Sequence, residues 1–366
     1  MRLREYEDRV SWLGRLSLRP SSFCLSIMRI VFLGSGEFAV PTLRWLTQSE
    51  HEVSLVVTQP ARPSGRGRIP TPTPVANFAQ AAGWQVLEVE NVNEPAVVSR
   101  LRSMEARLGL VIAFGQKLGS DVLAVTPTGF INLHASLLPQ YRGAAPINWA
   151  MMRGEEKTGC TMFRIVGRMD AGPILTQRWT FVKAEETAGE LHDRLAGIGV
   201  DAVRAALELF QDGAIPAGEP QDDTLATLAP KLKKSDGFLW FDGPVRDVVN
   251  HIRGVTPWPG ASAVYRNQAG KEEGVLLTRV RPIPVVDSER EPSAVGESIT
   301  RVRRSPIPES SGVGPGEIDE RLFVASRDGF LEILEIKPSS GRVMSWPDFV
   351  NGRHVTPGDR FLSPPR

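Results

Sequence analysis

Short apolar runs alternate with helix-like stretches from Met28 onward, and this alternation limits the possible fold more than any other feature of the chain. Such alternation predicts βαβ units, in which a mostly parallel sheet is covered by helices on both faces. The expected strands are 29–33, 52–58, 85–89, 108–114, 130–134, 159–166 and 173–182. The expected helices are 38–47, 74–82, 95–102 and 188–210. Together they predict one open α/β domain.

The composition of the sequence changes after about residue 216, where Pro, Gly and Asp become frequent. Short strand-like runs separated by turn residues predict a small β-barrel or sandwich, with Trp258 in its core. These runs are 238–241, 262–265, 274–280, 322–326 and 330–336. A length of 366 residues accommodates two domains, so we expect a catalytic domain over 28–215 and a smaller domain over 216–366.

Two segments differ from the rest in composition. Residues 285–317 are rich in Ser, Pro, Glu and Arg and poor in apolar residues, which predicts a disordered insert in the second domain. Residues 1–27 contain five arginines, but acidic residues such as Glu5 and Glu7 do not suit a targeting peptide. We therefore expect a disordered extension or a misassigned start, with an organellar presequence as the main alternative.

Charge and cysteine content exclude several classes of protein. The net charge of +1 excludes a uniformly basic nucleic-acid coat, so any contact with RNA must come from local patches. Cys24 and Cys160 lie far apart and in no motif, which argues against a disulfide framework or zinc ribbon and favours a reducing, cytoplasmic location. No run of about 18 apolar residues occurs, so we expect no transmembrane helix and no membrane partner.

The turn after the first expected strand contains Gly34-Ser-Gly36, which raises the question of a dinucleotide site. The third glycine of the G-x-G-x-x-G pattern is missing, because its position holds Ala39. The second strand ends in Thr58-Gln59, without the acidic residue that would bind a ribose hydroxyl. These departures favour a tight turn into a helix over a dinucleotide site.

Asn132 and His134 lie two residues apart at the end of an apolar strand. Because side chains alternate along a strand, both should point to the same face, where the carboxyl ends of strands in open α/β sheets bind ligands. The structural alternative is that Asn132 caps a turn and His134 is a buried core histidine. Asp170 follows the next strand and would supply a carboxylate that orients the imidazole, although alone it reads as an ordinary turn residue.

The stretch Ile131–Pro146 resembles the signature of the folate-dependent formyltransferases, through its Asn-x-His, Ser-Leu-Leu-Pro and Tyr-Arg-Gly elements. The resemblance continues through Asp170-Ala-Gly-Pro-Ile174 and runs from Met28 to nearly the end of the chain, interrupted at 285–317. It implies a Rossmann-like formyltransferase domain followed by an OB-like barrel. Among these enzymes the chain is most similar to those that formylate the initiator methionyl-tRNA.

The resemblance also implies a mechanism. The amine of the acceptor would attack the formyl carbon of 10-formyltetrahydrofolate, with Asn132 and His134 holding the oxyanion and Asp170 assisting proton removal. Such chemistry requires no metal, and the five histidines are too scattered to form a metal-binding pattern. We expect a monomer that needs only the folate cosubstrate and the tRNA.

The resemblance places the folate pocket beside the ends of two expected strands. The candidate residues are Phe114, Gly115, Ser136, Leu137, Leu138 and Pro139. Apolar walls with backbone hydrogen bonds suit a flat pterin ring. A buried strand followed by a rigid turn has the same composition, so only the resemblance makes these residues site candidates.

A basic loop directly follows the second expected strand and carries Arg62, Arg66 and Arg68. Arginines grip phosphates and stack on unpaired bases, while the interspersed glycines let the backbone approach a ligand. A solvated basic loop is the alternative. A similar loop enters the acceptor stem in enzymes that formylate methionyl-tRNA, so the resemblance implies that these arginines bind tRNA.

Two other enzymatic functions are compatible with the same three polar residues. A formyltransferase acting on an amino sugar nucleotide would share the Asn-x-His strand but would be expected to lack the basic loop. A formyltetrahydrofolate hydrolase would use water in place of the amine and would need neither that loop nor a second barrel. Both features therefore favour a tRNA acceptor.

Overall fold

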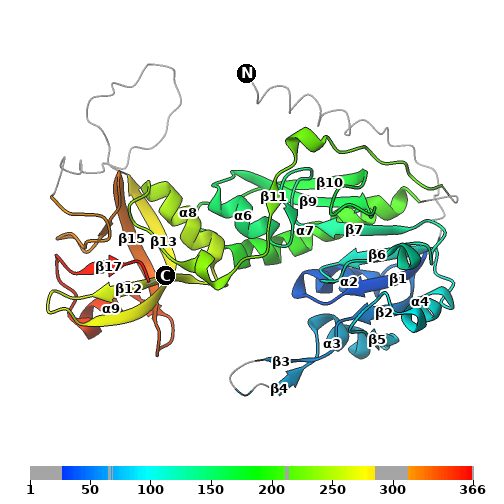
Figure 1. The fold of residues 1–366 in the computed structure, drawn as a ribbon, viewed down its shortest axis with the longest axis horizontal. Coiled ribbons are helices and arrows are strands. Elements are labelled where there is room, and N and C mark those ends of the chain that lie inside the picture. Colours follow the sequence, from blue (N-terminus) through cyan, green and yellow to red (C-terminus); the bar gives the residue numbers. More distant parts are fainter. Residues whose placement is uncertain (1–26, 65–66, 68, 211–213, 285–311, 365–366) are drawn as a thin grey trace.

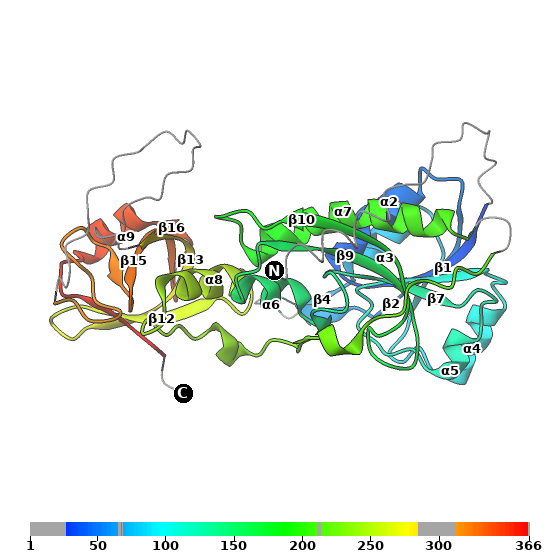
Figure 2. The same ribbon diagram turned by 90° about the horizontal axis from the view of Figure 1, so that it is seen from above.

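The computed structural model describes residues 27–64, 67, 69–210, 214–284 and 312–364, which form two domains that lie end to end (Figure 1). The view from above shows the same arrangement, with the second domain at one end of the long axis (Figure 2). Residues 1–26, which hold most of the expected extension, and Cys24 lie outside this described part. Within it, every helix is too short or too polar to span a bilayer.

The first domain is built on a seven-stranded sheet with the order β10-β9-β7-β6-β1-β2-β5. The strands are β1 (Arg29–Gly34), β2 (Glu52–Thr58), β5 (Val86–Glu88), β6 (Leu108–Ile112), β7 (Phe130–His134), β9 (Lys157–Arg164) and β10 (Ile174–Phe181). From β7 to β5 the neighbours are parallel, while β9 runs antiparallel to both β7 and β10. The prediction of an open, mostly parallel sheet is confirmed.

Helices cover both faces of this sheet, because side chains of buried strands alternate between the two faces. On one face, Ile131 and Leu133 share a core with α2 (Val40–Leu46), α3 (Pro74–Ala81) and α7 (Ala188–Glu208). On the other face, Val111 and Phe130 share a core with α4 (Pro95–Arg102) and α5 (Ser120–Leu123). The strand β7 is thus fixed from both sides.

Several boundaries differ from those that the sequence predicts. The strand expected over 108–114 ends at Ile112, because Ala113 has a positive φ of 48° that breaks the extended backbone. The helix expected over 38–47 consists of a 3-10 turn, η2 (Glu37–Ala39), followed by α2. A helix that we did not expect, α6 (Pro146–Met152), follows the polar end of β7 and packs against the second domain.

The second domain is an antiparallel sheet that curls into a nearly closed barrel, as predicted (Figure 1). Its strands run in the order β14-β15-β13-β12-β17, with β16 paired to β15. They are β12 (Ala261–Arg266), β13 (Glu272–Pro284), β14 (Val324–Ala325), β15 (Gly329–Pro338), β16 (Met344–Ser345) and β17 (Arg360–Leu362). Helices α8 (Val245–Val255) and α9 (Trp346–Arg353) pack on this sheet.

Three expectations for the second domain are wrong. Phe238–Phe241 does not form a strand: its pairing is limited to one isolated bridge, between Phe238 and Ser262. Trp258 lies outside the core and is 55% exposed. The last residues of the expected insert, 312–317, belong to the fold, since the amide of Gly316 donates to the carbonyl of Ala325. Residues 285–311 lie outside the described part.

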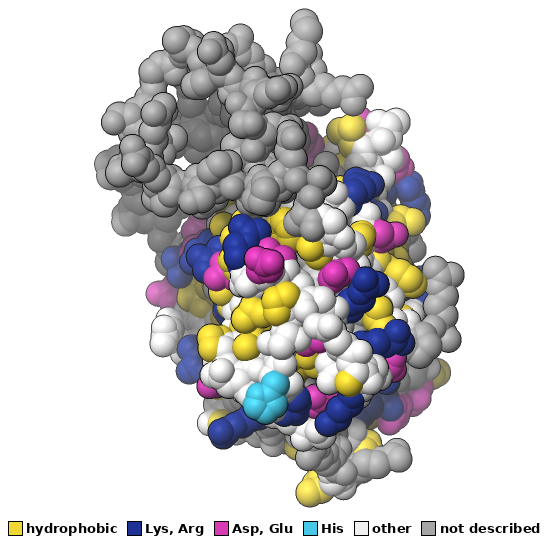
Figure 3. Space-filling model, turned by 90° about the vertical axis from the view of Figure 1, so that its left-hand side faces the viewer, with side chains coloured by type: hydrophobic (Ala, Val, Ile, Leu, Met, Phe, Trp, Pro, Cys, Tyr) yellow, Lys and Arg dark blue, Asp and Glu magenta, His cyan; other side chains and the backbone are white. Residues whose placement is uncertain are grey.

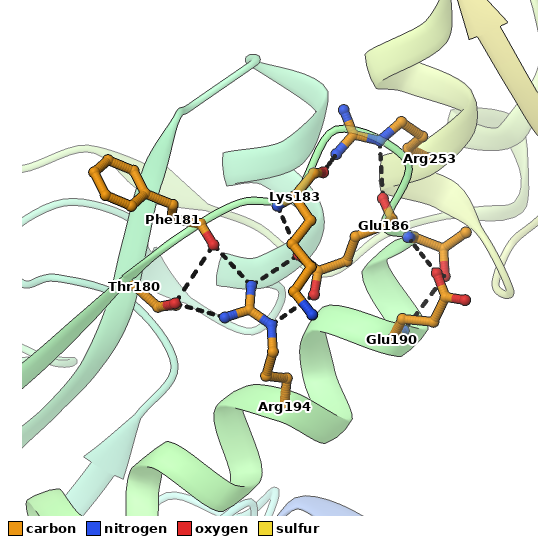
Figure 4. Close-up of polar contacts among 8 residues, drawn as sticks. Thr180, Phe181, Lys183, Glu186, Glu190, Arg194 and Arg253 are labelled. Carbon is orange, nitrogen blue, oxygen red and sulfur yellow. Dashed lines mark hydrogen bonds and ion pairs between the residues drawn. The ribbon is translucent and has the colours of Figure 1, made fainter.

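Polar contacts around the start of α7 join the two domains (Figure 4). Arg253 on α8 donates hydrogen bonds to the carbonyl oxygens of Glu186 (2.8 Å) and Lys183 (2.6 Å) in the first domain. Helices α6 and α8 also approach closely, because a Cβ atom on Gly254 would lie only 2.5 Å from Cγ of Met152. The second domain is therefore attached to the first by specific contacts as well as by the linker.

Candidate active site

The carboxyl ends of β1, β2, β6 and β7 meet at one edge of the sheet, because these strands run parallel. The turn after β1 is tied to the end of β6, since the amides of Ser35 and Gly36 both donate to the carbonyl of Ala113. Gln59, at the end of β2, donates from Nε2 to the carbonyl of Phe114 at 2.8 Å. This edge is where open α/β sheets bind ligands.

Asn132 and His134 reach this edge from one face of β7. Their neighbours Ile131 and Leu133 point into the core beneath α7, so the two polar side chains point the other way. His134 is buried, whereas Asn132 is only partly buried. Among the described residues, the Asn132 amide has no hydrogen-bond partner. It is thus available to a ligand at the edge of the sheet.

The imidazole of His134 is held by both of its nitrogens. Nε2 lies 2.8 Å from the carbonyl oxygen of Tyr141. Because a carbonyl can only accept, Nε2 carries a hydrogen and donates it. Nδ1 lies 3.8 Å from Oδ2 of Asp170, a distance that suits an ion pair better than a hydrogen bond. In the neutral ring Nδ1 is therefore the basic nitrogen, and it faces Asp170.

Asp170 lies in a turn after β9, and its carboxylate points back toward β7. Its Oδ2 accepts a hydrogen bond from the amide of Gly143 at 2.8 Å. Its φ is +49°, a conformation that costs a residue with a side chain about 1–2 kcal/mol. The turn is tight, because a Cβ atom on Gly172 would lie 1.7 Å from the carbonyl oxygen of Arg164. The chain thus brings Asp170 to His134 across a separation of 36 positions.

Tyr141 anchors the loop between β7 and α6, a role that we did not predict from the sequence. Its hydroxyl donates to Oε1 of Glu155 at 2.5 Å, and its amide donates to Oγ1 of Thr227 at 2.9 Å. Burial and the hydrogen bond to Glu155 raise the pKa of the Tyr141 hydroxyl far above its ordinary value. The hydroxyl therefore stays protonated and keeps the carbonyl of Tyr141 in place for His134.

The expected folate residues after β7 form a rigid, internally satisfied turn. Ser136 is fully buried, and its Oγ donates to the carbonyl of Gln140 at 2.6 Å. Leu138 is also buried, and its amide donates to Oγ1 of Thr161. Leu137 and Pro139 are partly exposed beside them. Only these last two side chains can therefore offer a surface to a ligand.

Phe114 and Gly115 lie at the end of β6, next to the same edge. Phe114 is buried in the core, and its carbonyl oxygen already accepts a hydrogen bond from Gln59. Gly115 has a φ of +80°, which turns the chain away after β6. Gly115 is exposed, so a contribution to a pocket would come from its backbone, as hydrogen-bonding groups.

The expected basic loop is a β-hairpin rather than an irregular loop. Strand β3 (Arg62–Ser64) pairs antiparallel with β4 (Ile69–Thr71), and the hairpin projects from the body of the first domain (Figure 1). Arg62 is exposed and forms an ion pair with Glu90 at 2.8 Å. Arg66 and Arg68 lie outside the described residues. The hairpin follows β2 and so begins at the edge that carries His134.

On the outer end of the second domain, the described residues form no uniform positive patch. Figure 3 shows Lys and Arg side chains interspersed with Asp, Glu and apolar side chains on that face. Among the described residues, no three His, Cys, Asp or Glu side chains lie together in a way that could hold a metal ion. Cys160 is fully buried, and burial raises the pKa of its thiol to about 12, so it remains a neutral core residue.

Known protein families match most of the chain. The family model for formyl transferases matches residues 28–207, and the model for the formyl transferase C-terminal domain matches residues 231–354. A methionyl-tRNA formyltransferase of Solibacter usitatus is 39% identical over 91% of this chain and 98% of its own length. One from Moorella thermoacetica is 36% identical over the same shares of both chains. The similarity therefore includes both domains.

Solved structures share the fold at much lower identity. HypX from Aquifex aeolicus in complex with tetrahydrofolic acid superposes with a TM-score of 0.55 at 17% identity, covering 89% of this chain. Our chain spans about half of that protein, 47% of its length. WlaRD, a sugar 3N-formyl transferase crystallised with dTDP and 5-N-formyl-THF, superposes with a TM-score of 0.56 at 14% identity, over 87% of this chain and 100% of WlaRD. These likenesses establish the two-domain fold.

Proposed function

Because the chain belongs to the formyl transferase family, we propose that its site moves a formyl group from 10-formyltetrahydrofolate to the α-amino group of initiator methionyl-tRNA. One observation carries this proposal. The chain is similar over both of its domains to enzymes that are methionyl-tRNA formyltransferases, and not only over the catalytic domain. The product would be formylmethionyl-tRNA.

The polar groups at the edge of the sheet fit a formyl donor. The amide of Asn132 has no partner within the described residues, so it can donate to an incoming oxygen. The partly exposed Leu137 and Pro139 offer apolar surface beside it, and the backbone near Gly115 offers polar groups. The folate carrier supplies the activated formyl group when it is bound.

Asn132 and His134 stabilise the formyl oxygen as it gains negative charge. Asn132 donates from its side-chain amide. His134 donates from Nδ1 once that nitrogen is protonated, because Nε2 is already bound to the carbonyl of Tyr141. Asp170, whose Oδ2 lies 3.8 Å from Nδ1, compensates the charge that the ring then carries. One such donor typically contributes about 10²–10³ in rate.

The overall reaction balances without an oxidant or a nucleophilic side chain. The bond from the formyl carbon to N10 of the folate breaks, and a new bond to the α-amino nitrogen forms. The amine loses one proton, and N10 gains one. His134 and Asp170 are the ionisable pair at the site that can move this proton.

We also propose that the protein works as a monomer in the cytoplasm, with Arg62, Arg66 and Arg68 on the tRNA side of the site. The hairpin that carries Arg62 begins at the same edge of the sheet as the catalytic residues, which supports this placement. Size-exclusion chromatography with light scattering tests the monomer, since a dimer would double the mass of 40.1 kDa.

The direct test is an assay of the full chain with charged initiator methionyl-tRNA and 10-formyltetrahydrofolate. Formylmethionyl-tRNA and free formate are measured in the same reaction. Formylated tRNA is the expected product. Formate without formylated tRNA would indicate a hydrolase, and neither product would redirect the search to amino sugar nucleotides.

A further inference from the structure

The segment that connects the two domains lies against the loop that holds the catalytic residues. The amide and carbonyl of Glu219 both pair with Ile174 at 2.8 Å, where β10 begins. Further along, β11 (Leu228–Ala229) pairs in parallel with β8 (Arg142–Gly143). The linker thus contacts the segment that follows Asp170, and it also contacts β8, the short strand whose Gly143 binds the carboxylate of Asp170.

Gln221 is the linker residue that connects these two parts. Its Nε2 donates to the carbonyl oxygens of Asp170 (2.9 Å) and Gly172 (2.7 Å). Its Oε1 accepts from Nε (3.1 Å) and Nη2 (2.7 Å) of Arg142. Both hydrogens of the amide and its oxygen are therefore used, and all of them bind residues that flank the candidate site.

The turn at Asp170 needs such external support. Its left-handed backbone is unfavourable for a residue with a side chain, and such conformations persist only where the surroundings fix them. The carboxylate of Asp170 is fixed by the amide of Gly143, which follows Arg142 directly. Gln221 therefore holds Asp170 in two ways. It binds the carbonyl of Asp170 directly, and it binds Arg142 of β8, the strand whose Gly143 binds the carboxylate of Asp170.

The linker also compensates the charge of Arg142, which is only 7% exposed. Nη1 of Arg142 forms an ion pair with Asp223 at 2.9 Å, and Asp223 binds Arg168 at 2.8 Å. Together these contacts fix Arg142 in one conformation, so that its guanidinium presents Nε and Nη2 to Gln221.

We propose that Gln221 is a positioning residue for the formyl-transfer site, acting through the backbone of Asp170 and through Arg142. The inference rests on the proposed function, because the placement of Asp170 affects a rate only if Asp170 acts on the reacting groups. It adds the interdomain linker to the parts of the chain that shape the site.

The kinetic test compares Gln221→Glu with the wild-type protein. The variant keeps an oxygen for Arg142 but loses both donors, and it sets a carboxylate against two carbonyl oxygens. We expect kcat to fall by about 10- to 100-fold and both KM values to change by less than about 3-fold, since a small displacement of a catalytic group affects mainly the chemical step. Gln221→Ala, which adds no charge, is expected to lower kcat in the same way.

The control is Gln80→Glu, the same substitution on the exposed face of α3, which should leave kcat unchanged. An unchanged kcat in both Gln221 variants would overturn the inference. So would a loss of activity that simply follows a lower fraction of folded protein in thermal unfolding, because Gln221 would then have only a structural role.

A second measurement needs no substrate and separates this inference from the proposed function. In protein labelled with ¹⁵N-glycine, the amide signals of Gly143 and Gly172 report on the two ends of the contact. We expect both to shift in Gln221→Glu but not in Gln80→Glu. If the wild-type protein formylates no methionyl-tRNA, the proposed function fails, and these signals still decide whether Gln221 holds the turn; unmoved signals would overturn that role.

Discussion

Nδ1 of His134 lies 3.8 Å from Oδ2 of Asp170, and the two side chains are held in place by different backbone groups of one short segment. The carbonyl of Tyr141 binds the imidazole, and the amide of Gly143 binds the carboxylate. The geometry of the pair therefore depends on the segment 141–143 more than on a direct bond between the two residues. Variants of the pair can thus change its charge while keeping its placement.

Replacing Asp170 by Asn should lower kcat for methionyl-tRNA by about 10²-fold or more, because the charge that compensates protonated His134 is lost. The amide oxygen of the new residue can still accept from Gly143, so the fold should be retained. The measurement is steady-state formylation together with thermal unfolding.

A matched control exists elsewhere in the chain. His192 and Asp193 form a second His–Asp pair, with Nδ1 to Oδ1 at 2.9 Å, on the exposed side of α7. Asp193→Asn should leave kcat unchanged. Equal activity of Asp170→Asn and Asp193→Asn would contradict a catalytic role for Asp170.

Replacing Asn132 by Ala should lower kcat by about 10²–10³ with little change in stability. The expected loss is that of one oxyanion donor, and the Asn132 amide makes no hydrogen bond within the described part of the chain that the substitution could break. Asn148→Ala should show the opposite pattern, because Nδ2 of Asn148 donates to the carbonyl of Gly254 across the domain junction. If Asn132→Ala instead lowers the stability of the protein and leaves kcat unchanged, Asn132 has the capping role.

Much of the fold could be predicted because its signals are local. The alternating apolar runs locate every strand of the large sheet, and the period of two places Asn132 and His134 on one face of β7. The missed helix α8 also carried a local signal, since Val245, Val248 and Ile252 follow helical spacing. We did not predict this helix, because the frequent turn residues of this region indicated short strands instead.

The surroundings of the site could not be predicted in the same way. Gln221 contacts Asp170 across 51 positions, and Thr227 contacts Tyr141 across 86. No periodicity encodes such contacts, because they arise only when the linker folds back on the first domain. The pairing of Asp170 with the Asn-x-His strand end and the resemblance to a known family both pointed to Asp170, but the residues that position it become visible only in three dimensions.

The exposed arginine of the β3–β4 hairpin provides a test of tRNA binding. Its ion pair with Glu90 is on the surface and should contribute less than about 1 kcal/mol, so Arg62→Ala should leave stability nearly unchanged. If Arg62 contacts a phosphate, KM for tRNA should rise, and the slope of its logarithm against the logarithm of salt concentration should fall by about one. Arg100→Ala, on α4, is the control. An unchanged salt dependence would remove Arg62 from the tRNA-binding surface.

The last prediction concerns the buried ion pair between Glu186 and Arg194, shown in Figure 4. Burial alone would raise the pKa of Glu186, but hydrogen bonds from Arg194 and from the amide of Lys183 outweigh it and hold that pKa below its usual 4.5. A carboxylate whose pKa is lower in the folded state contributes stability that is present above the unfolded value and lost as the pH falls through the folded one.

Glu186→Gln should therefore reduce the free energy of unfolding by about 1–3 kcal/mol at pH 7, because Arg194 loses its charged partner. The difference from the wild-type protein should shrink as the pH falls below 4.5, where Glu186 becomes protonated in the wild type as well. Urea unfolding at several pH values measures this difference. Glu208→Gln, at an exposed position of α7, the helix that carries Arg194, should show no such dependence. A deficit for Glu186→Gln that stays constant down to pH 3 would mean that packing of the side chain, and not its charge, stabilises the start of α7.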